Sequence, residues 1–342
     1  MIRDAVEGID RLYRRSGANL PLADPRPSHG AEMEGYFWRF TDVDAGRVAV
    51  ALCGVNRHPE GDWATVAIAT HPNGVVRSVV APAASASRER FHVCVDGVLE
   101  ATENRLQVDL SPEARVDVEI GDRFDWPLAT GGGGAFSAVP FLGQYWHPHV
   151  LGGRASGDIV AGGEAWELNG ANVYAEKNWG AGFPARWWWG QAQGFEHPDV
   201  CVAFSGGVLT AGPLALTVGG AVVRVGDEVL RLTPPFAIVR SSVSEGRWRV
   251  EARSLRHRVR ITGDGTMGEP HVLPVPVPSE RRNADTDFEH LAGHLEVEVT
   301  RGARTLFRGS SQLAALEVGH RPDDAESARW VNSALGGVRA SR

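Results

Sequence analysis

Apolar and polar residues alternate with a period of two through most of this chain of 342 residues. In "GHLEVEVTRG", Leu295, Val297 and Val299 fall on one side and Glu296 and Glu298 on the other, as the pleat of a β-strand requires. The rhythm recurs in "RVDVEIGD", "DVCVAFSGG", "RWRVEARSL" and "HRVRITGDG", and several of these runs end at Gly or Asp, which favour tight turns. The pattern predicts an all-β fold of many short antiparallel strands.

The segments outside this pattern lie at the two ends of the chain. Apolar residues at helical spacing predict a short helix over residues 2–15, followed by a proline-rich lead-in, and "HRPDDAESARWVNSALG" predicts a helical tail. A single barrel of ordinary size would not use so many strands, so we expect two β-barrels in tandem. The expected divisions are 1–30 for the helix and lead-in, 31–190 for the first barrel, 191–320 for the second and 321–342 for the tail.

Composition excludes several classes of function. The chain has 35 basic and 42 acidic residues, so no concentrated basic face for a nucleic acid is expected. The three cysteines are far apart, and neither HExxH, GxGxxG, a P-loop nor GxSxG occurs, so we expect no metal and no cofactor. The charged N-terminus is unlike a secretory signal and no apolar run could span a bilayer, which predicts a cytoplasmic protein.

The stretch "VYAEKNWGAGFPARWWWGQ", residues 173–191, combines an acid, a base and several indoles. On a strand, alternation groups Tyr174 with Glu176 and Asn178, and places Lys177 with Trp179 on the opposite face. An ordinary structural interpretation is a tryptophan-rich core in which the acid and the base form unremarkable ion pairs. Spacing alone slightly favours that interpretation.

Beyond the glycine- and proline-containing turn, the same stretch continues as a second strand with Trp187, Trp189 and Gln191 on one face. Buried amides need hydrogen-bond partners that a dry core does not supply. A face of indoles and amides therefore suits a pocket that holds a large, mostly apolar ligand with a few polar atoms.

Two further segments hold candidate site residues. In "EMEGYFWRF", Glu34 shares a strand face with Tyr36 and Trp38, and burial beside aromatic rings raises the pKa of a carboxyl so that it can serve as an acid. The alternative is that Glu34 is exposed or paired with Arg39. In "QYWHPHV", His147 precedes a proline that disfavours regular pairing, so we expect a hydrogen-bonded loop histidine, with a proton relay as the alternative.

These motifs together resemble the tocopherol cyclase family. The family has a similar Tyr-x-Glu-Lys-x-Trp-Gly-x-x-Phe-Pro run followed by tryptophans and a glutamine, matched here by Tyr174, Glu176, Lys177, Trp179, Gly180, Phe183, Pro184, Trp187 and Gln191. "MEGYFWRF", "FLGQYWHPHVLGGRASGDI" and "SQLAALEVGH" are similar to other family segments and occur in the family's order. The resemblance covers roughly residues 30–320.

The resemblance implies two lipocalin-like barrels, related to carotenoid hydratases and pericyclase-type proteins, and a ring-closing reaction. In that reaction an acid protonates an alkene of an isoprenoid or similar apolar substrate, and a phenol oxygen captures the cation. We expect Glu176 to be the acid, with Glu34 as the second candidate, and Lys177 to hold a neighbouring carboxylate or a substrate oxygen. The expected substrate-binding residues are Tyr36, Trp38, His147, Tyr174, Asn178, Trp179, Trp187, Trp189 and Gln191.

Two other functions fit the same pattern of strands. A non-catalytic lipocalin-like carrier of an apolar small molecule needs the aromatic cavity but no poised acid. A purely structural pair of β domains predicts a filled core and no pocket. For both the cyclase and the carrier, the expected partner is an apolar small molecule. Peripheral contact with a membrane through an apolar surface patch is a further alternative.

Overall fold

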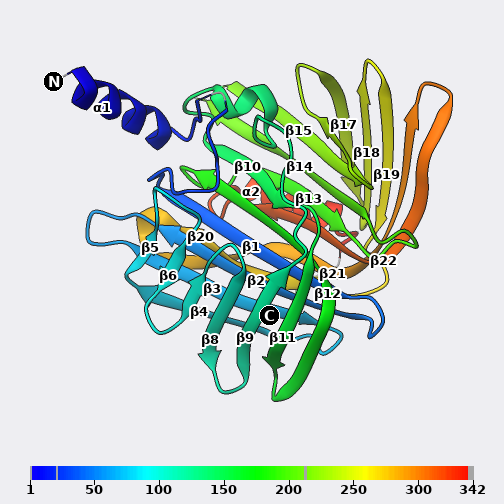
Figure 1. Cartoon of the computed structure of the whole chain (residues 1–342), viewed down its shortest axis with the longest axis horizontal. Coiled ribbons are helices and arrows are strands. Elements are labelled where there is room, and N and C mark those ends of the chain that lie inside the picture. The colour runs from blue at the N-terminus through cyan, green and yellow to red at the C-terminus, as the bar shows by residue number, and fades with distance from the viewer. Residues whose placement is uncertain (1, 21, 212–213, 338–342) are drawn as a thin grey trace.

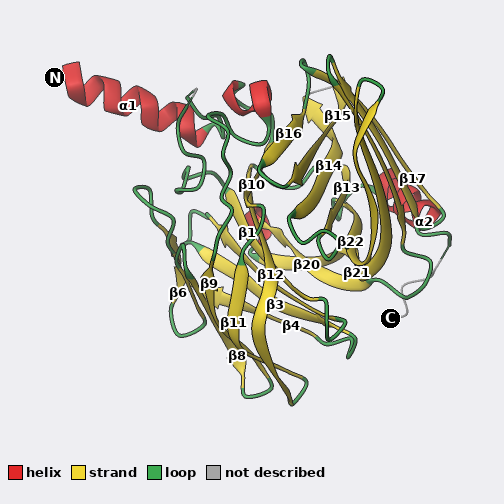
Figure 2. Ribbon diagram, turned by 45° about the vertical axis from the view of Figure 1, so that its right-hand side comes forward, coloured by secondary structure: helices red, strands yellow, loops and turns green. Residues whose placement is uncertain are grey.

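A computed structural model describes residues 2–20, 22–211 and 214–337 of the chain. Within these residues the strands form two antiparallel sheets, which Figures 1 and 2 show as strongly curved bodies packed against each other. The first sheet contains β1 (Met33–Asp42), β2 (Arg47–Asn56), β3 (Trp63–His71), β4 (Val76–Pro82), β5 (Ala84–Ala86), β6 (Val93–Val95), β7 (Leu99–Ala101), β8 (Arg105–Ser111), β9 (Ala114–Gly121), β10 (Gln144–Val150), β11 (Arg154–Ala161) and β12 (Glu164–Gly180).

The second sheet repeats this plan with the rest of the chain. It contains β13 (Arg186–Ala192), β14 (Val200–Ala211), β15 (Leu214–Val225), β16 (Glu228–Leu232), β17 (Ala237–Ser244), β18 (Arg247–Ser254), β19 (His257–Asp264), β20 (His271–Val277), β21 (Arg282–Arg301) and β22 (Arg304–His320). The chain passes between the sheets at residues 181–185, slightly before the expected division at 190.

Each sheet curls on itself by the same device. The strand order of the first sheet runs from β4 to β5, and these two strands are consecutive in the chain, separated only by Ala83. The order of the second sheet likewise runs from β16 to β17, which residues 233–236 connect. Both sheets thus return to their starting edge, and the all-β, two-barrel lipocalin-like prediction is confirmed.

Short helices flank the strands, as predicted. The helix α1 (Ile2–Arg15) extends away from the sheets in both views, and α2 (Ala325–Ala334) packs against β22 and β17. Two 3-10 turns, η1 (Gly134–Ala138) and η2 (Pro278–Glu280), lie in connections. Neither helix in the described part of the chain has the length and apolar character needed to cross a membrane.

Strand alternation explains why several strands are buried on both faces. On β1, Tyr36 and Trp38 point into the core of the first barrel, whereas Phe37 packs between the two sheets. On β13, Trp188 lies in the core of the second barrel, whereas Trp189 packs between the sheets. One face of β1 and one face of β13 therefore fill their own barrels, and the opposite face of each of these two strands forms part of the contact between the barrels.

Candidate active site

A cavity of about 200 Å³ lies between the two barrels rather than inside either of them. Strands β1, β2, β10 and β12 of the first sheet form one wall, and β13–β15 and β20–β22 of the second sheet form the other. Aromatic side chains line it, among them Phe37, Trp146, Phe183, Trp187 and Trp189. The outward faces of both barrels thus supply a largely apolar, aromatic-lined space of the kind that the tryptophan-rich motif predicts.

The carboxyl of Glu176 projects into this cavity from β12. Its Oε2 atom accepts hydrogen bonds from Trp146 Nε1 at 2.7 Å, Tyr174 Oη at 2.5 Å and Trp189 Nε1 at 3.0 Å. No described residue donates to Oε1. Three donors on one oxygen leave no room for a proton there, so a protonated Glu176 holds its proton on Oε1.

The protonation of Glu176 follows from its surroundings. Burial raises the pKa of this carboxyl from 4.5 to about 7, although the three hydrogen bonds from Tyr174, Trp146 and Trp189 act in the opposite direction. A substantial fraction of Glu176 is therefore the neutral acid near neutral pH. This is the property that the sequence motif predicts for a proton donor.

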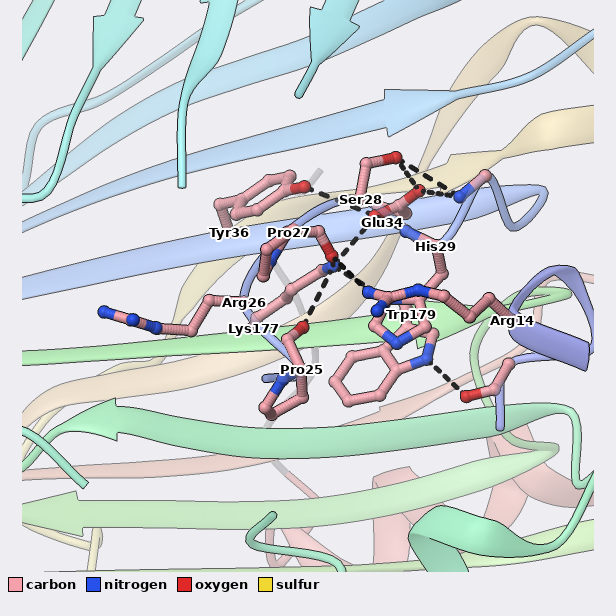
Figure 3. Close-up of polar contacts among 12 residues, drawn as sticks. Arg14, Pro25, Arg26, Pro27, Ser28, His29, Glu34, Tyr36, Lys177 and Trp179 are labelled. Carbon is pink, nitrogen blue, oxygen red and sulfur yellow. Dashed lines mark hydrogen bonds and ion pairs between the residues drawn. The ribbon is translucent and has the colours of Figure 1, made fainter. Parts of the chain in front are cut away.

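Lys177, the next residue on β12, points to the other face of the strand. Figure 3 shows its ammonium group surrounded by Glu34, Pro27 and His29. Nζ lies 2.9 Å from Glu34 Oε2, 2.8 Å from the carbonyl of Pro27 and 3.0 Å from His29 Nδ1. Lys177 therefore holds a neighbouring carboxylate, one of its two predicted roles, but it does not reach the cavity.

The imidazole of His29 is neutral in this cluster. An ammonium group can only donate, so His29 Nδ1 accepts from Lys177, and the ring proton lies on Nε2, which donates to Asn19 Oδ1 at 3.0 Å. Burial and the charge of Lys177 hold the pKa of His29 well below its usual value. The indole of Trp179 stacks on His29 with ring centroids 4.3 Å apart, which closes the cluster on one side.

Glu34 is an anion in this structure and not the second candidate acid. Burial alone would raise the pKa of Glu34, but the charge of Lys177, with hydrogen bonds from Lys177, Ser28 Oγ and the His29 amide, lowers it below the usual value. The alternative pairing of Glu34 with Arg39 does not form, because alternation sends Arg39 to the opposite face of β1; the arginine near Glu34 is Arg57, whose Nη2 lies 3.7 Å from Oε1. Arg39 instead donates to the carbonyls of Leu291 and Leu313 at 2.6 and 2.7 Å.

The predicted substrate-binding residues separate into two groups. Asn178, Trp187 and Trp189 line the cavity; Tyr36 also contributes to its wall, although its ring packs in the core of the first barrel. The indole of Trp187 lies across Gly319, its partner on β22, where any Cβ atom would come within 2.0 Å of the ring. This glycine permits the flat placement that lets Trp187 donate to Glu317.

Five predicted substrate-binding residues lie outside the cavity lining. Trp38 packs in the first core, and Trp179 stacks between His29 and Tyr145. Gln191 is buried beside Cys201, and Tyr174 lies behind Glu176 and positions it.

His147 is the fifth, and it does lie on a paired strand. A bulge between Pro148 and Val150 accommodates the proline in β10. His147 Nδ1 accepts from the Gly132 amide at 3.1 Å, and burial lowers its pKa to about 3. It is therefore a neutral, hydrogen-bonded histidine, as one of the two interpretations predicted, but it is buried and lies away from the cavity.

Sequence reasoning missed three further carboxyls in the cavity wall. Asp287 and Glu289 on β21 and Glu317 on β22 line the cavity together with Glu176. Burial is the largest cause of a raised pKa at each: to about 8 for Glu289, to about 7 for Glu317 and well above the usual value for Asp287. The sequence does contain a signal for the burial of Glu317, since this residue lies between apolar Leu316 and Val318 in the segment "SQLAALEVGH".

No group of three His, Cys, Asp or Glu side chains in the described ranges is arranged to hold a metal ion. The cavity wall holds four carboxyls beside neutral polar groups such as Asn178, and burial raises the pKa of each of the four. Two curved antiparallel sheets with an aromatic, acid-containing cavity between them define a lipocalin-like two-domain protein with a site for an apolar ligand.

The chain belongs to the tocopherol cyclase-like family, whose sequence profile matches residues 84–320. It is similar to a probable chloroplastic tocopherol cyclase of Oryza sativa subsp. japonica, with 29% identity over 215 residues, and to a chloroplastic tocopherol cyclase of Zea mays, with 26% identity over 211 residues. Each alignment covers 55% of this chain and 42% of the relative. The matched part of the chain thus spans less than half the length of these relatives.

Solved structures share the fold at low sequence identity. Kievitone hydratase from Nectria haematococca superposes with a TM-score of 0.50 and 12% identity, covering 89% of this chain and 93% of that chain. CghA with Sch210972 gives a TM-score of 0.53 and 13% identity over 84% and 88% of the two chains. A putative AttH from Nitrosomonas europaea gives a TM-score of 0.51 and 13% identity, covering 89% of this chain and 98% of that chain. These likenesses concern the fold alone.

Proposed function

We propose that this protein is a cyclase that closes a ring on an isoprenoid or similar apolar substrate by protonating an alkene. The observation that carries the proposal is the carboxyl of Glu176, which is buried in an aromatic cavity, accepts three hydrogen bonds on Oε2 and has Oε1 left for a proton. The relatives from rice and maize are named tocopherol cyclases, which supports ring closure as the class of reaction.

The chemistry begins with transfer of the Oε1 proton of Glu176 to one alkene carbon. The other alkene carbon becomes a tertiary cation, and a hydroxyl oxygen of the same substrate attacks it to close the ring. The carboxylate left behind is stabilised by the donors that already contact Oε2, namely Trp146, Tyr174 and Trp189. The acid therefore becomes charged without any reorganisation of its partners.

The cavity walls suit the cationic intermediate. Indole faces attract a cation through their quadrupole, by about 2 kcal/mol or more when water is excluded. Trp146, Trp187 and Trp189 place three indoles around the cavity. A substrate that fills the space between the barrels would displace water, which would otherwise capture the cation before the substrate's own hydroxyl could react.

The proposal is tested with purified protein and a geranylated trimethylhydroquinone in heavy water. The expected product is a ring-closed chromanol with one deuterium on the former alkene carbon. Glu176→Gln should fold normally and lower turnover by about 10²- to 10⁴-fold, the usual contribution of a positioned acid. Glu167→Gln, an exposed position on the same strand, serves as the matched control. A folded Glu176→Gln protein with full turnover would rule out the proton-donor role.

A carrier function makes a different prediction in the same experiment. A carrier binds the prenylated hydroquinone and returns it unchanged, with no deuterium at the alkene. A carrier has no use for a carboxyl kept neutral at the cost of burying it, whereas an acid catalyst requires one. Tight binding of several isoprenoids without product formation would therefore favour carriage over catalysis.

A further inference from the structure

The second-sheet wall of the cavity carries a carboxyl group that no residue satisfies. Glu289 on β21 is 0% exposed and lines the cavity. Neither Oε1 nor Oε2 has a hydrogen-bond partner among the described residues, and the nearest cation, Arg39 Nη1, lies 3.8 Å from Oε1. A buried polar group without hydrogen-bond partners is costly, so an unpaired carboxyl in the cavity wall indicates a ligand that supplies a donor.

The groups around Glu289 hold it in place without occupying its oxygens. Arg39 Nη2 donates to the carbonyls of Leu291 and Leu313, which holds the guanidinium near Glu289. Its Nη1 and Nε have no hydrogen-bond partner in the described part of the chain, and Nη1 forms an ion pair with Glu289 at 3.8 Å, longer than a hydrogen bond. Glu317 lies directly opposite Glu289 on β22 and accepts from the indole of Trp187. One oxygen of Glu317, Oε1, therefore has a donor, whereas neither oxygen of Glu289 has one among the residues that the structure describes.

The charges near Glu289 keep it close to the balance between its two protonation states. Burial and the neighbouring Glu317 raise the pKa of Glu289 to about 8, while Arg39 acts in the opposite direction. The titratable or charged groups that face it are Arg39 on β1, Glu176 on β12, Glu317 on β22, His271 opposite it on β20 and Asp287 on its own strand. A carboxyl with this environment can bind a proton and release it again at neutral pH.

Building on the proposed function, we propose that Glu289 is a second catalytic residue, which binds the substrate hydroxyl that closes the ring and removes its proton. Glu176 on the first-sheet wall forms the new C–H bond. The hydroxyl oxygen forms the new C–O bond, its O–H bond breaks, and the proton passes to the carboxylate of Glu289. The substrate is isomerised with no loss of atoms. Proton exchange with water when the product leaves returns a proton to Glu176 and removes one from Glu289, which restores the acid and the base.

This assignment also specifies the ligand class. Glu289 requires a hydroxyl donor, whereas the aromatic part of the cavity requires an apolar chain with an alkene. The substrate therefore lies with its hydroxyl toward β21 and its alkene toward Glu176. A hydrocarbon without a hydroxyl group would leave Glu289 unpaired and would bind less tightly.

The test uses two probes in heavy water: geranylated trimethylhydroquinone, which can close a ring, and its monomethyl ether blocked at the hydroxyl next to the chain, which cannot. Proton transfer to the blocked probe appears as deuterium exchange into the alkene methyl groups. Glu289→Gln should lower ring closure by about 100-fold or more while exchange into the blocked probe stays close to the wild-type rate. Glu296→Gln, on the exposed face of the same strand, should leave both rates unchanged.

Each outcome separates the two proposals. If the wild-type protein shows neither exchange nor ring closure, alkene protonation is wrong and the role of Glu289 is wrong with it. If the wild-type protein closes the ring and Glu289→Gln does so equally fast, or loses exchange as well as closure, only the role of Glu289 is overturned.

A measurement on the wild-type protein covers the case in which Glu289→Gln does not fold. By calorimetry, trimethylhydroquinone should bind at least about tenfold more tightly than its dimethyl ether, which cannot donate a hydrogen bond. Equal binding of the two compounds would overturn the assignment without any variant.

Discussion

Trp189 Nε1, on the first strand of the second sheet, lies 3.0 Å from Glu176 Oε2, on the last strand of the first sheet. The candidate acid is thus held by a donor from the other barrel. Trp187, two residues earlier on the same strand, donates to Glu317. One strand therefore positions acids on both walls of the cavity, and the contact between barrels is also part of the site.

Replacing Trp189 by Phe should shift the pH profile of ring closure. The indole N–H favours the charged form of Glu176, so its loss should raise the pKa of Glu176 above about 7 and move the decline of activity to higher pH. The profile of kcat against pH measures this. Trp188→Phe is the matched control because Trp188 points into the core of the second barrel. An unchanged decline in Trp189→Phe would contradict the role of the indole.

The contribution of Glu176 to stability should decrease as the pH rises from 5 to 8. Glu176 keeps its proton in the folded state up to about pH 7, whereas the unfolded chain releases it near 4.5, so the unfolded state is favoured progressively between these values. Glu289 and Glu317 act in the same direction.

Urea denaturation of the wild type and of Glu176→Gln at pH 5 and pH 8 measures how much Glu176 contributes to the pH dependence of the free energy of unfolding. The variant should lose less stability than the wild type over this interval, by at most about 3 kcal/mol. Glu167→Gln should behave as the wild type. Equal changes of stability in the wild type and in Glu176→Gln over this interval would show that Glu176 is already ionised in the folded state at pH 5.

The ion pair between Lys177 and Glu34 should show strong coupling in a double-mutant cycle. Both side chains are completely buried, so Lys177→Met leaves an anion, and Glu34→Gln a cation, without its partner. Each single change should cost about 3–5 kcal/mol, and the double variant less than their sum. The free energies of unfolding of the four proteins give the coupling, and additive losses would refute it.

Gly35→Ala should disturb the cavity more than Gly54→Ala, although the two glycines pair directly across β1 and β2. A Cβ atom at Gly35 would lie 2.5 Å from Oδ1 of Asn178, whereas one at Gly54 would meet its nearest neighbour, Pro276, at 3.5 Å. Gly35→Ala should therefore cost about 1–3 kcal/mol and raise KM by displacing Asn178 from the lining. Similar stability and KM in the two variants would argue against this.

Much of the architecture could be predicted from the sequence because alternation is a local property. The strand over Leu295–Val299 and the opposite placement of Glu176 and Lys177 follow directly from the period of two. The place of the cavity could not be obtained in this way. Alternation separates the two faces of a strand, but it does not say which face lines its own barrel and which meets the other.

The contacts of individual side chains could not be predicted from the sequence either. Glu34 is ionised because Lys177, more than 140 positions away in the chain, lies beside it. Trp38 and Trp189 look alike as aromatic residues on apolar strands, yet one fills a core and the other contacts the acid. Asp287 and Glu289 drew no attention because their strand mixes polar and apolar residues, and only the packing of the sheets buries them.

The passage of the chain between sheets at residues 181–185 has a consequence for how such a protein can arise and be engineered. The acid comes from the N-terminal half, and its indole donor and the opposing carboxyls come from the C-terminal half. Neither half produced separately would possess a reaction centre, however well it folded. Mixing complementary fragments should restore turnover only when they reassociate, and shuffling halves between relatives should change substrate preference by altering one wall at a time.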